Sequence, residues 1–412
     1  MENNNIKKNF IWNTTGSFVY LFCQWLLTLL VVRMSSTLNN AGNLALAIAI
    51  TNAFFNLACF NLRPYLVSDN KKEYTVADYT TFRTITTVVS LILCIIYISM
   101  FKYSPDQFLC IVLFMIFKIG EAVVDLFHAF EQRKNRMDIG GISLLCRGIL
   151  SLLSFYLGLK LTNNINMAII LMIVTTYTFI LLFDFPKVNT FEKVKIKLNK
   201  KHIKNLFIAL LPLAIGSVLS TISTAFPRQM LEKINGTSIL GIYATIATPA
   251  VIVQVAASYI YNPLLTSFAD FRKKKDYKNT VNLLKKVLLI ILVLSLVCYI
   301  GALVFAKPVL GLLFGNKIAK HSYLFGPIII YTSLTGFLWL FHNILIVFRK
   351  IKALMLIEIS GFVLCLITAK FFITKFYMNG VSYNLIFITI VMIIEMLIAT
   401  YIEISKMKKE KV

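Results

Sequence analysis

The length of its apolar runs is the feature that most limits what this sequence can fold into. A helix needs about 20 apolar residues to cross the hydrocarbon core of a bilayer, because it rises only about 1.5 Å per residue. The sequence therefore predicts an all-α polytopic membrane protein of about twelve transmembrane helices. The runs lie approximately at Phe10–Val32, Gly42–Leu62, Phe82–Phe101, Gln107–Phe130, Ile139–Leu161, Asn166–Phe183, Ile203–Ala225, Ser238–Leu265, Leu284–Ala306, Tyr323–Phe348, Ala353–Thr374 and Val381–Ile404.

Composition and the placement of charge agree with this class. Charged residues make up only 15% of the chain and hydrophobic residues 58%, whereas a soluble domain carries about 25% charged residues. The net charge of +24 would suit a nucleic-acid partner, but Lys and Arg are concentrated in alternate loops, where they orient a membrane protein. We therefore expect no nucleic-acid partner, contact with bilayer lipids, and a multi-pass protein of the bacterial inner membrane with both termini in the cytoplasm.

The two halves of the chain look related. The segment KNFIWNTTGSFVY opens the first half and KNLFIALLPLAIGSV opens the second, and a short run of lysines lies between the halves. Ordered similarities of this kind are typical of transporters built from repeats, with a midplane site between them. We expect pseudo-symmetric six-helix lobes at 1–190 and 203–412 around a central cavity, joined by a cytoplasmic linker at 191–202.

The fourth apolar run carries an unusual polar face. Its polar residues follow one another three or four positions apart, which places them on one side of a helix, and Arg147 lies within the next run. An ionised side chain near the bilayer centre costs several kcal/mol unless it is paired or faces water, so this face should meet a partner or a cavity. The residues are Lys118, Glu121, Asp125, His128 and Gln132.

Two interpretations of these charges remain open. Lys118, Glu121, Asp125 and Arg147 can form a salt-bridge network that only holds helices together. Alternatively, Lys118 and Arg147 present positive charge to a pyrophosphate, for which cations are well suited, while an acid carries a coupling proton or Na⁺. Both can hold together.

Other polar positions give weaker signals. Arg228 ends the seventh run and is a third candidate for a cationic substrate contact, while Glu358 and Glu395 are lone acids in the last two runs. Pro212, Pro249 and Pro263 predict interruptions in the seventh and eighth runs, because proline removes a helix hydrogen bond. The sequence has no metal-ligand spacing of Cys or His, no phosphate-binding glycine loop and no catalytic motif. We expect no enzyme activity, no metal and no cofactor.

Several segments resemble the Wzx-type flippases, which translocate polysaccharide repeat units and share a superfamily with the multidrug and toxic-compound extruders. The likeness is clearest between Lys8 and Leu152. It is carried by NFIWNTTGSFVYLFCQWLLTLLVVR from Asn9, LRPYLVSD from Leu62, FRTITTVVSLILC from Phe82 and FKIGEAVVDLFHAFEQRKNRMDIGGISLLCRGILSL from Phe117.

The resemblance implies a twelve-helix, two-lobed fold that moves undecaprenyl-pyrophosphate-linked oligosaccharide, a precursor of O-antigen or capsule, by ion-coupled alternating access. It also implies a cationic cavity for the pyrophosphate, and a polysaccharide polymerase and chain-length regulator as partners. The positions that match the polar pattern of the family are Lys118, Glu121, Asp125, Gln132, Arg136, Asp138 and Arg147.

Three alternatives stay open. A multidrug or metabolite cation antiporter of the same superfamily would favour a cavity dominated by acids. A flippase for the peptidoglycan lipid precursor usually has additional C-terminal spans. A membrane polysaccharide polymerase or glycosyltransferase usually has a large outer loop or an acidic pair in the first one, whereas Ser35–Ala41 is short and has no acid.

Overall fold

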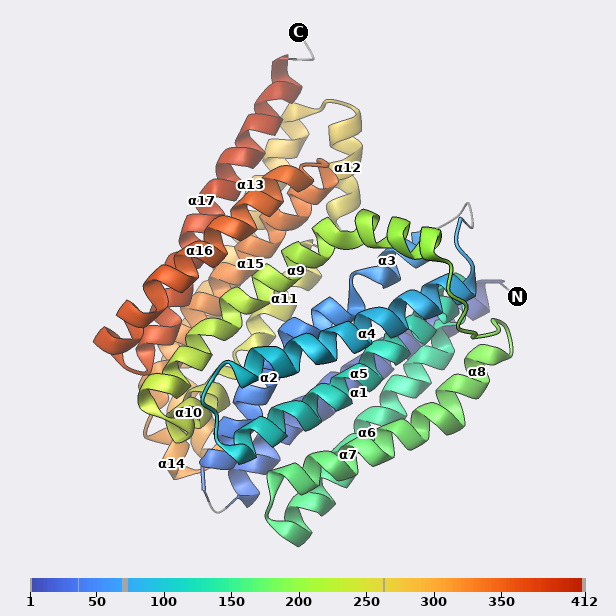
Figure 1. Cartoon of the computed structure of the whole chain (residues 1–412). Coiled ribbons are helices and arrows are strands. Elements are labelled where there is room, and N and C mark those ends of the chain that lie inside the picture. Colours follow the sequence, from blue (N-terminus) through green and yellow to red (C-terminus); the bar gives the residue numbers. More distant parts are fainter. Residues whose placement is uncertain (1, 36, 69–72, 262–263, 410–412) are drawn as a thin grey trace. The chain divides into compact units, whose positions relative to one another are not determined.

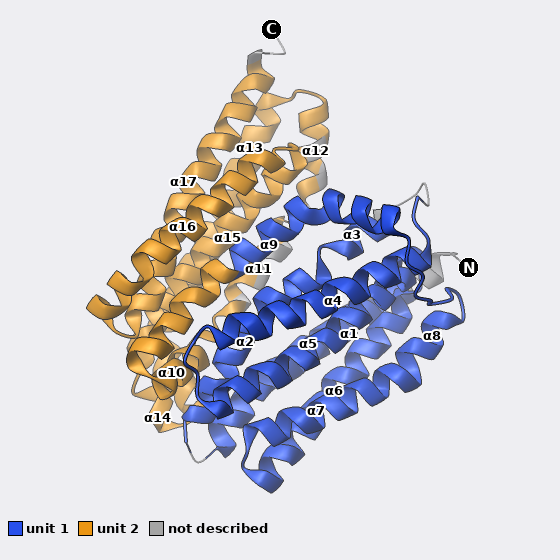
Figure 2. Cartoon of the chain, in the orientation of Figure 1, with its two compact units in different colours: residues 1–221 blue, residues 222–412 orange. Residues whose placement is uncertain are grey.

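The computed structural model describes residues 2–35, 37–68, 73–261 and 264–409. Over these residues the chain is helical, with short connections and no strand (Figure 1). It folds as two compact units, residues 1–221 and residues 222–412 (Figure 2), and the division falls within helix α9. The predicted lobe boundaries at 190 and 203 stay a prediction.

Over its described residues, the first unit contains nine α-helices, the last of which continues into the second unit. A π-helical turn at Ile180–Asp184 joins α7 to α8, and residues 190–199 form a non-helical connection to α9. The helices are α1 (Glu2–Met34), α2 (Asn39–Cys59), α3 (Leu62–Ser68), α4 (Val76–Ser99), α5 (Pro105–Arg133), α6 (Met137–Thr162), α7 (Ile165–Phe179), α8 (Phe185–Asn189) and α9 (Lys200–Asn235).

The second unit follows from α9 to the end of the described chain. The predicted interruption at Pro249 is confirmed, because residues 248–250 form a turn between two half-length helices. In contrast, α9 runs through Pro212 as one helix, and Pro263 lies outside the described residues. The helices are α10 (Thr237–Ala247), α11 (Val251–Tyr261), α12 (Leu265–Lys273), α13 (Tyr277–Phe314), α14 (Asn316–Ala319), α15 (Phe325–Val347), α16 (Ile351–Phe376) and α17 (Asn379–Lys409).

The predicted all-α polytopic class is confirmed. Ten helical segments of the described chain are long and apolar enough to cross a membrane, and each corresponds to one of the predicted runs. The two remaining runs are the polar-faced helix α5, which at 29 residues also has sufficient length, and the interrupted pair α10–α11. Large apolar side chains on α13, such as Leu303 and Leu312, are more than half exposed, as expected for a surface that faces lipid.

Helix starts in the first unit determine where the polar side chains lie. The Thr75 hydroxyl accepts a bond from the Asp78 backbone N–H, and the Asp78 carboxylate accepts one from Thr75, which forms a capping box. Helix α4 therefore begins at Val76, before the predicted run at Phe82, and Arg83 lies well inside it. A second capping box, Ser104 with Gln107, starts α5 at Pro105, a favourable first position for proline.

Candidate functional site

The polar face of α5 divides between two sets of partners. Asp125 contacts Arg63 of α3 and Arg83 of α4, whereas Glu121 contacts Arg147 of α6. Of the salt-bridge network considered for Lys118, Glu121, Asp125 and Arg147, the structure forms the Glu121–Arg147 pair, while Asp125 pairs with other arginines. Residues four positions apart on a helix are about 40° out of register, because 3.6 residues make a turn, so a long polar face can meet different neighbours at its two edges.

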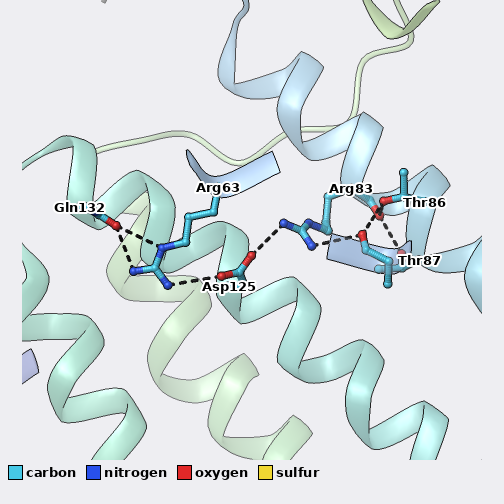
Figure 3. A network of polar contacts seen from close by, with 7 residues as sticks. Arg63, Arg83, Thr86, Thr87, Asp125 and Gln132 are labelled. Carbon is cyan, nitrogen blue, oxygen red and sulfur yellow. Dashed lines mark hydrogen bonds and ion pairs between the residues drawn. The ribbon is translucent and has the colours of Figure 1, made fainter. Parts of the chain in front are cut away.

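The first cluster, here called the arginine–aspartate network, consists of Arg63, Arg83, Asp125 and Gln132 (Figure 3). The Asp125 carboxylate accepts from Arg63 Nη1 at 3.3 Å and from Arg83 Nη2 at 2.9 Å. The Gln132 Oε1 atom accepts from Arg63 Nε at 3.1 Å and Nη2 at 3.0 Å. The network thus joins α3 and α4 to α5. The two α5 side chains that make these bonds, Asp125 and Gln132, lie two helical turns apart.

One end of the arginine–aspartate network is buried. Arg83 is 1% exposed, and it also donates to the Ala58 carbonyl at 3.2 Å. Thr86 donates to the same carbonyl at 2.8 Å, and Thr87 donates to the Arg83 carbonyl at 2.8 Å. A buried guanidinium needs a nearby counter-charge, and Asp125 is the carboxylate that supplies it.

The other end of the network is open. The side chains of Arg63 and Asp125 are 32% and 24% exposed, so Arg63 can reach a group outside the protein. Two arginines share one carboxylate, which leaves one positive charge in excess. The Arg63 guanidinium is also held in place, by Asp125 and Gln132.

Lys118 lies near the middle of α5 and is half-buried. Its ammonium group lies 5.1 Å from the centre of the Phe55 ring and 5.8 Å from that of Phe114. Within the described chain, it has no hydrogen bond and no ion pair. Cation–π contacts of this kind contribute about 1 kcal/mol at partly exposed sites, and they leave all three donors of the ammonium available.

The second cluster, here called the buried ion pair, joins α5 to α6 and α1. Arg147 contacts the Glu121 carboxylate, and the Tyr20 hydroxyl donates to the same carboxylate at 2.6 Å. Arg147 Nε also donates to the Ser143 hydroxyl at 3.2 Å. The Arg147 side chain is only 2% exposed, so we assign it to helix–helix packing and do not carry it forward as a contact for a pyrophosphate.

The candidate residues of the second unit have separate surroundings. Glu358 is buried and lies 3.4 Å from His342 Nδ1, and Glu395 accepts from the Ser360 hydroxyl at 2.6 Å. Arg228 is half-buried near the hydroxyls of Tyr243 and Tyr331. Both acids thus have local partners, whereas no carboxylate of the described residues pairs with Arg228.

Sequence reasoning missed four charged residues of the first unit, for reasons connected with helix boundaries and faces. Arg83 and Asp184 were placed at the ends of their runs, but the capping box extends α4 and the π-helical turn extends the α7 segment. Glu131 lies at the edge of the polar face, about 60° from His128, so the spacing of the other polar residues did not include it. The fourth residue is Arg63. Only Asp125 offered a signal, because a lone acid inside a membrane helix requires a cation from elsewhere.

The described residues include no group of three His, Cys, Asp or Glu side chains that could hold a metal ion. No protein-family model matches the sequence. The sequence is 26% identical over 323 residues to the capsular polysaccharide biosynthesis protein CapF of Staphylococcus aureus, an alignment that covers 76% of this chain and 79% of CapF.

Solved structures of two kinds resemble the model. An inward-facing multidrug resistance transporter of the MATE family, in the MOP superfamily, matches with a TM-score of 0.74 at 13% identity, over 98% of this chain and 100% of that one. The lipid II flippase MurJ in an inward closed conformation matches with a TM-score of 0.73 at 13% identity, over 96% of this chain and 90% of MurJ. The chain has the MATE and MurJ fold. The two solved proteins with this fold are a transporter and a flippase, and neither is an enzyme. The fold and the apolar helices show that this chain is a multi-pass membrane protein.

Proposed function

We propose that this protein is a Wzx-type flippase. It moves undecaprenyl-pyrophosphate-linked oligosaccharide repeat units, precursors of O-antigen or capsule, from the cytoplasmic to the outer leaflet of the inner membrane. The similarity to a capsular polysaccharide biosynthesis protein and the fold shared with a lipid II flippase support this substrate class. We also propose a polysaccharide polymerase and a chain-length regulator as partners, because they act on the exported repeat units.

One observation carries the proposal: among the described residues Lys118, a cation inside a membrane helix, makes no ion pair and no hydrogen bond. The acid one turn away, Glu121, is already bound by Arg147 and Tyr20. A lysine near the centre of a membrane helix costs about 2.5–3.5 kcal/mol. Its contacts with Phe55 and Phe114 compensate only part of that cost. A diphosphate group that passes beside Lys118 supplies the missing negative charge.

Arg63 is the second proposed contact for the diphosphate. Its guanidinium is oriented by Asp125 and Gln132 yet partly exposed, and a fixed guanidinium suits phosphate oxygens better than a flexible ammonium does. Arg63 and Lys118 both belong to the first unit, which makes that unit the proposed site of headgroup recognition.

The alternative of a multidrug or metabolite cation antiporter is less well supported by the same contacts. A cationic drug needs an available carboxylate. In the first unit, Asp125 is shared by two arginines and Glu121 is paired with Arg147. Two further acids, Glu131 and Asp184, are 0% exposed, so a drug cannot reach them in this arrangement, whereas Lys118 and Arg63 are partly exposed.

Deletion of the gene tests this function. We expect the deletion strain to accumulate undecaprenyl-linked repeat units in the cytoplasmic leaflet and to lose surface glycan, measured by lipid extraction and by glycan staining. Normal surface glycan in that strain would refute the proposal.

Complementation then tests the two cations. We expect Lys118→Ala and Arg63→Ala each to reduce glycan export at least tenfold at equal protein levels. The matched control is the double substitution Lys193→Ala and Lys195→Ala, which removes two exposed lysines of the connection before α9 and should change export less than twofold. An equal loss of glycan export in all three variants would show that export depends on the total positive charge and not on the positions of Lys118 and Arg63.

A further inference from the structure

Three titratable side chains of the first unit are buried without hydrogen-bond partners. Glu131 and Asp184 are both 0% exposed, and none of their four carboxyl oxygens has a hydrogen-bond partner in the part of the chain that the structure describes. His128 is 6% exposed, and its Nε2 atom likewise has none. The proposed flippase contacts make no use of these groups.

The three side chains come from two helical segments, α5 and the π-helical turn, and α6 packs beside them. His128 and Glu131 are three residues apart on α5 and so lie on the same side of it. Both reach Gly140 of α6, where an added Cβ atom would lie 2.8 Å from Glu131 Oε2 and 3.1 Å from His128 Cδ2. Asp184 ends the π-helical turn that packs against α5. Such turns occur often at functional sites.

The charged groups around this cluster already have partners of their own. They are Arg63, Arg147, Asp138 and Glu121. Arg63 is bonded to Asp125, Arg147 to Glu121, and Asp138 to Arg136 and Lys8. Asp184 forms an ion pair with Arg147, whose Nε lies 3.8 Å away, a separation too long for a hydrogen bond. The Ser143 hydroxyl, which Arg147 also contacts, lies close to the Asp184 carboxyl as well. Among the described residues, Glu131 is therefore the acid of this cluster that has no ion pair.

These surroundings favour the neutral carboxyl form. An ionised carboxylate in an apolar environment without a hydrogen bond is strongly disfavoured, and it takes up a proton instead. Two neighbouring carboxyls also oppose each other's ionisation.

We propose that Glu131, Asp184 and His128 form the proton site of this transporter, with Glu131 as the group that binds and releases the coupling proton. The coupling of this proton to repeat-unit export rests on the proposed function, whereas the presence of the proton on Glu131 does not. In the buried arrangement described here, Glu131 carries its proton. When the site opens to water, the O–H bond breaks, the proton passes to water and the carboxylate remains. His128, beside the same glycine, is the neighbouring base that can accept the proton in transit.

Infrared spectroscopy of the purified, reconstituted protein tests the proton directly. The carbonyl stretch of a protonated carboxyl group is distinct from the carboxylate bands. We expect this absorption at neutral pH in the wild-type protein and expect it to disappear in alkali. Glu131→Gln should remove the larger part and Asp184→Asn the remainder. The control, Glu192→Gln, removes an acid paired with Arg133 and Lys134 and should leave the band unchanged. An absent wild-type band, or one insensitive to Glu131→Gln, overturns the proposal.

A pair of substitutions separates proton transfer from packing. Glu131→Gln keeps the shape of the side chain and loses its titration, whereas Glu131→Asp keeps a titratable group and loses a methylene. A proton role predicts at least tenfold lower repeat-unit export for Glu131→Gln and partial export for Glu131→Asp, while a packing role predicts the reverse order. The infrared result does not depend on the transported molecule, so it would stand even if deletion of the gene left the surface glycan intact.

Discussion

Arg83 is a fully buried cation, and its position explains why an aspartate is needed on the polar face of α5. The guanidinium is 1% exposed and is held by Asp125 and by the Ala58 carbonyl. Removal of one partner from a buried pair leaves an uncompensated charge, which costs more than the pair contributes when intact. Asp125 therefore has a structural role toward Arg83 and an orienting role toward Arg63.

We expect Asp125→Asn to lower the free energy of unfolding by about 3 kcal/mol, because it leaves Arg83 charged and unpaired. The double substitution Asp125→Asn with Arg83→Gln should recover most of that loss. Thermal unfolding in detergent measures both. The control is Lys8→Ala, whose ion pair with Asp138 involves a side chain that is 57% exposed and should cost less than about 1 kcal/mol. A double variant as unstable as the sum of its parts would contradict the pairing.

The packing of α1 against α6 depends on glycines that allow backbones to meet. An added Cβ at Gly141 would lie 2.2 Å from the Trp12 carbonyl oxygen, and one at Gly16 would lie 1.9 Å from the Gly141 carbonyl oxygen. Small residues at such crossings are typical of membrane helices, in which close backbone approach contributes to association. The buried ion pair of Arg147 with Glu121 lies along the same interface, which α1 joins through Tyr20.

We expect Gly141→Ala to destabilise the protein by about 1–3 kcal/mol, because the backbone that it meets cannot move aside as a side chain would. The matched control is Gly301→Ala in α13, where nothing lies within 4 Å of the added Cβ. That change should be neutral or stabilise by up to about 1 kcal/mol, through helix propensity. The melting temperature in detergent should fall in the first variant only, and an equal response in both would argue against the close crossing.

At the level of elements, the sequence was sufficient to predict which segments are helices and insufficient to predict their ends. Apolar length identified the runs because a bilayer imposes one thickness on all of them. The capping box at Thr75 and the π-helical turn at Ile180–Asp184 depend on local hydrogen bonds, which hydropathy does not report. Because of these two features, Arg83 and Asp184 lie within helical segments and not at the ends of apolar runs. The partners of Asp125 could not be predicted, because helical spacing gives a direction on α5 but does not identify the helix that faces it.

For the whole molecule, the fold could be predicted from hydropathy and family likeness, and the agreement with the MATE transporter and with MurJ confirms it. Orientation in the membrane is a separate prediction, which rests on the alternation of Lys and Arg between loops. We expect green fluorescent protein fused to the C-terminus to fluoresce, and alkaline phosphatase at the same position to be inactive. The opposite pair of results would place the C-terminus outside the cytoplasm.

The turn at residues 248–250 has a consequence for how the second unit meets the bilayer. Lipid tails cannot form hydrogen bonds, so a backbone that leaves the helical pattern at membrane depth must be covered by protein or wetted. Pro249 has no N–H group to donate, and α10 and α11 are each only 11 residues long, about half of what is needed to cross the core. The turn meets part of this demand itself, because the N–H groups of Ala250, Val251 and Val253 donate to the carbonyls of Ala247, Thr248 and Ala250. Local hydrogen bonds of this kind allow two half-length helices to take the place of one continuous span.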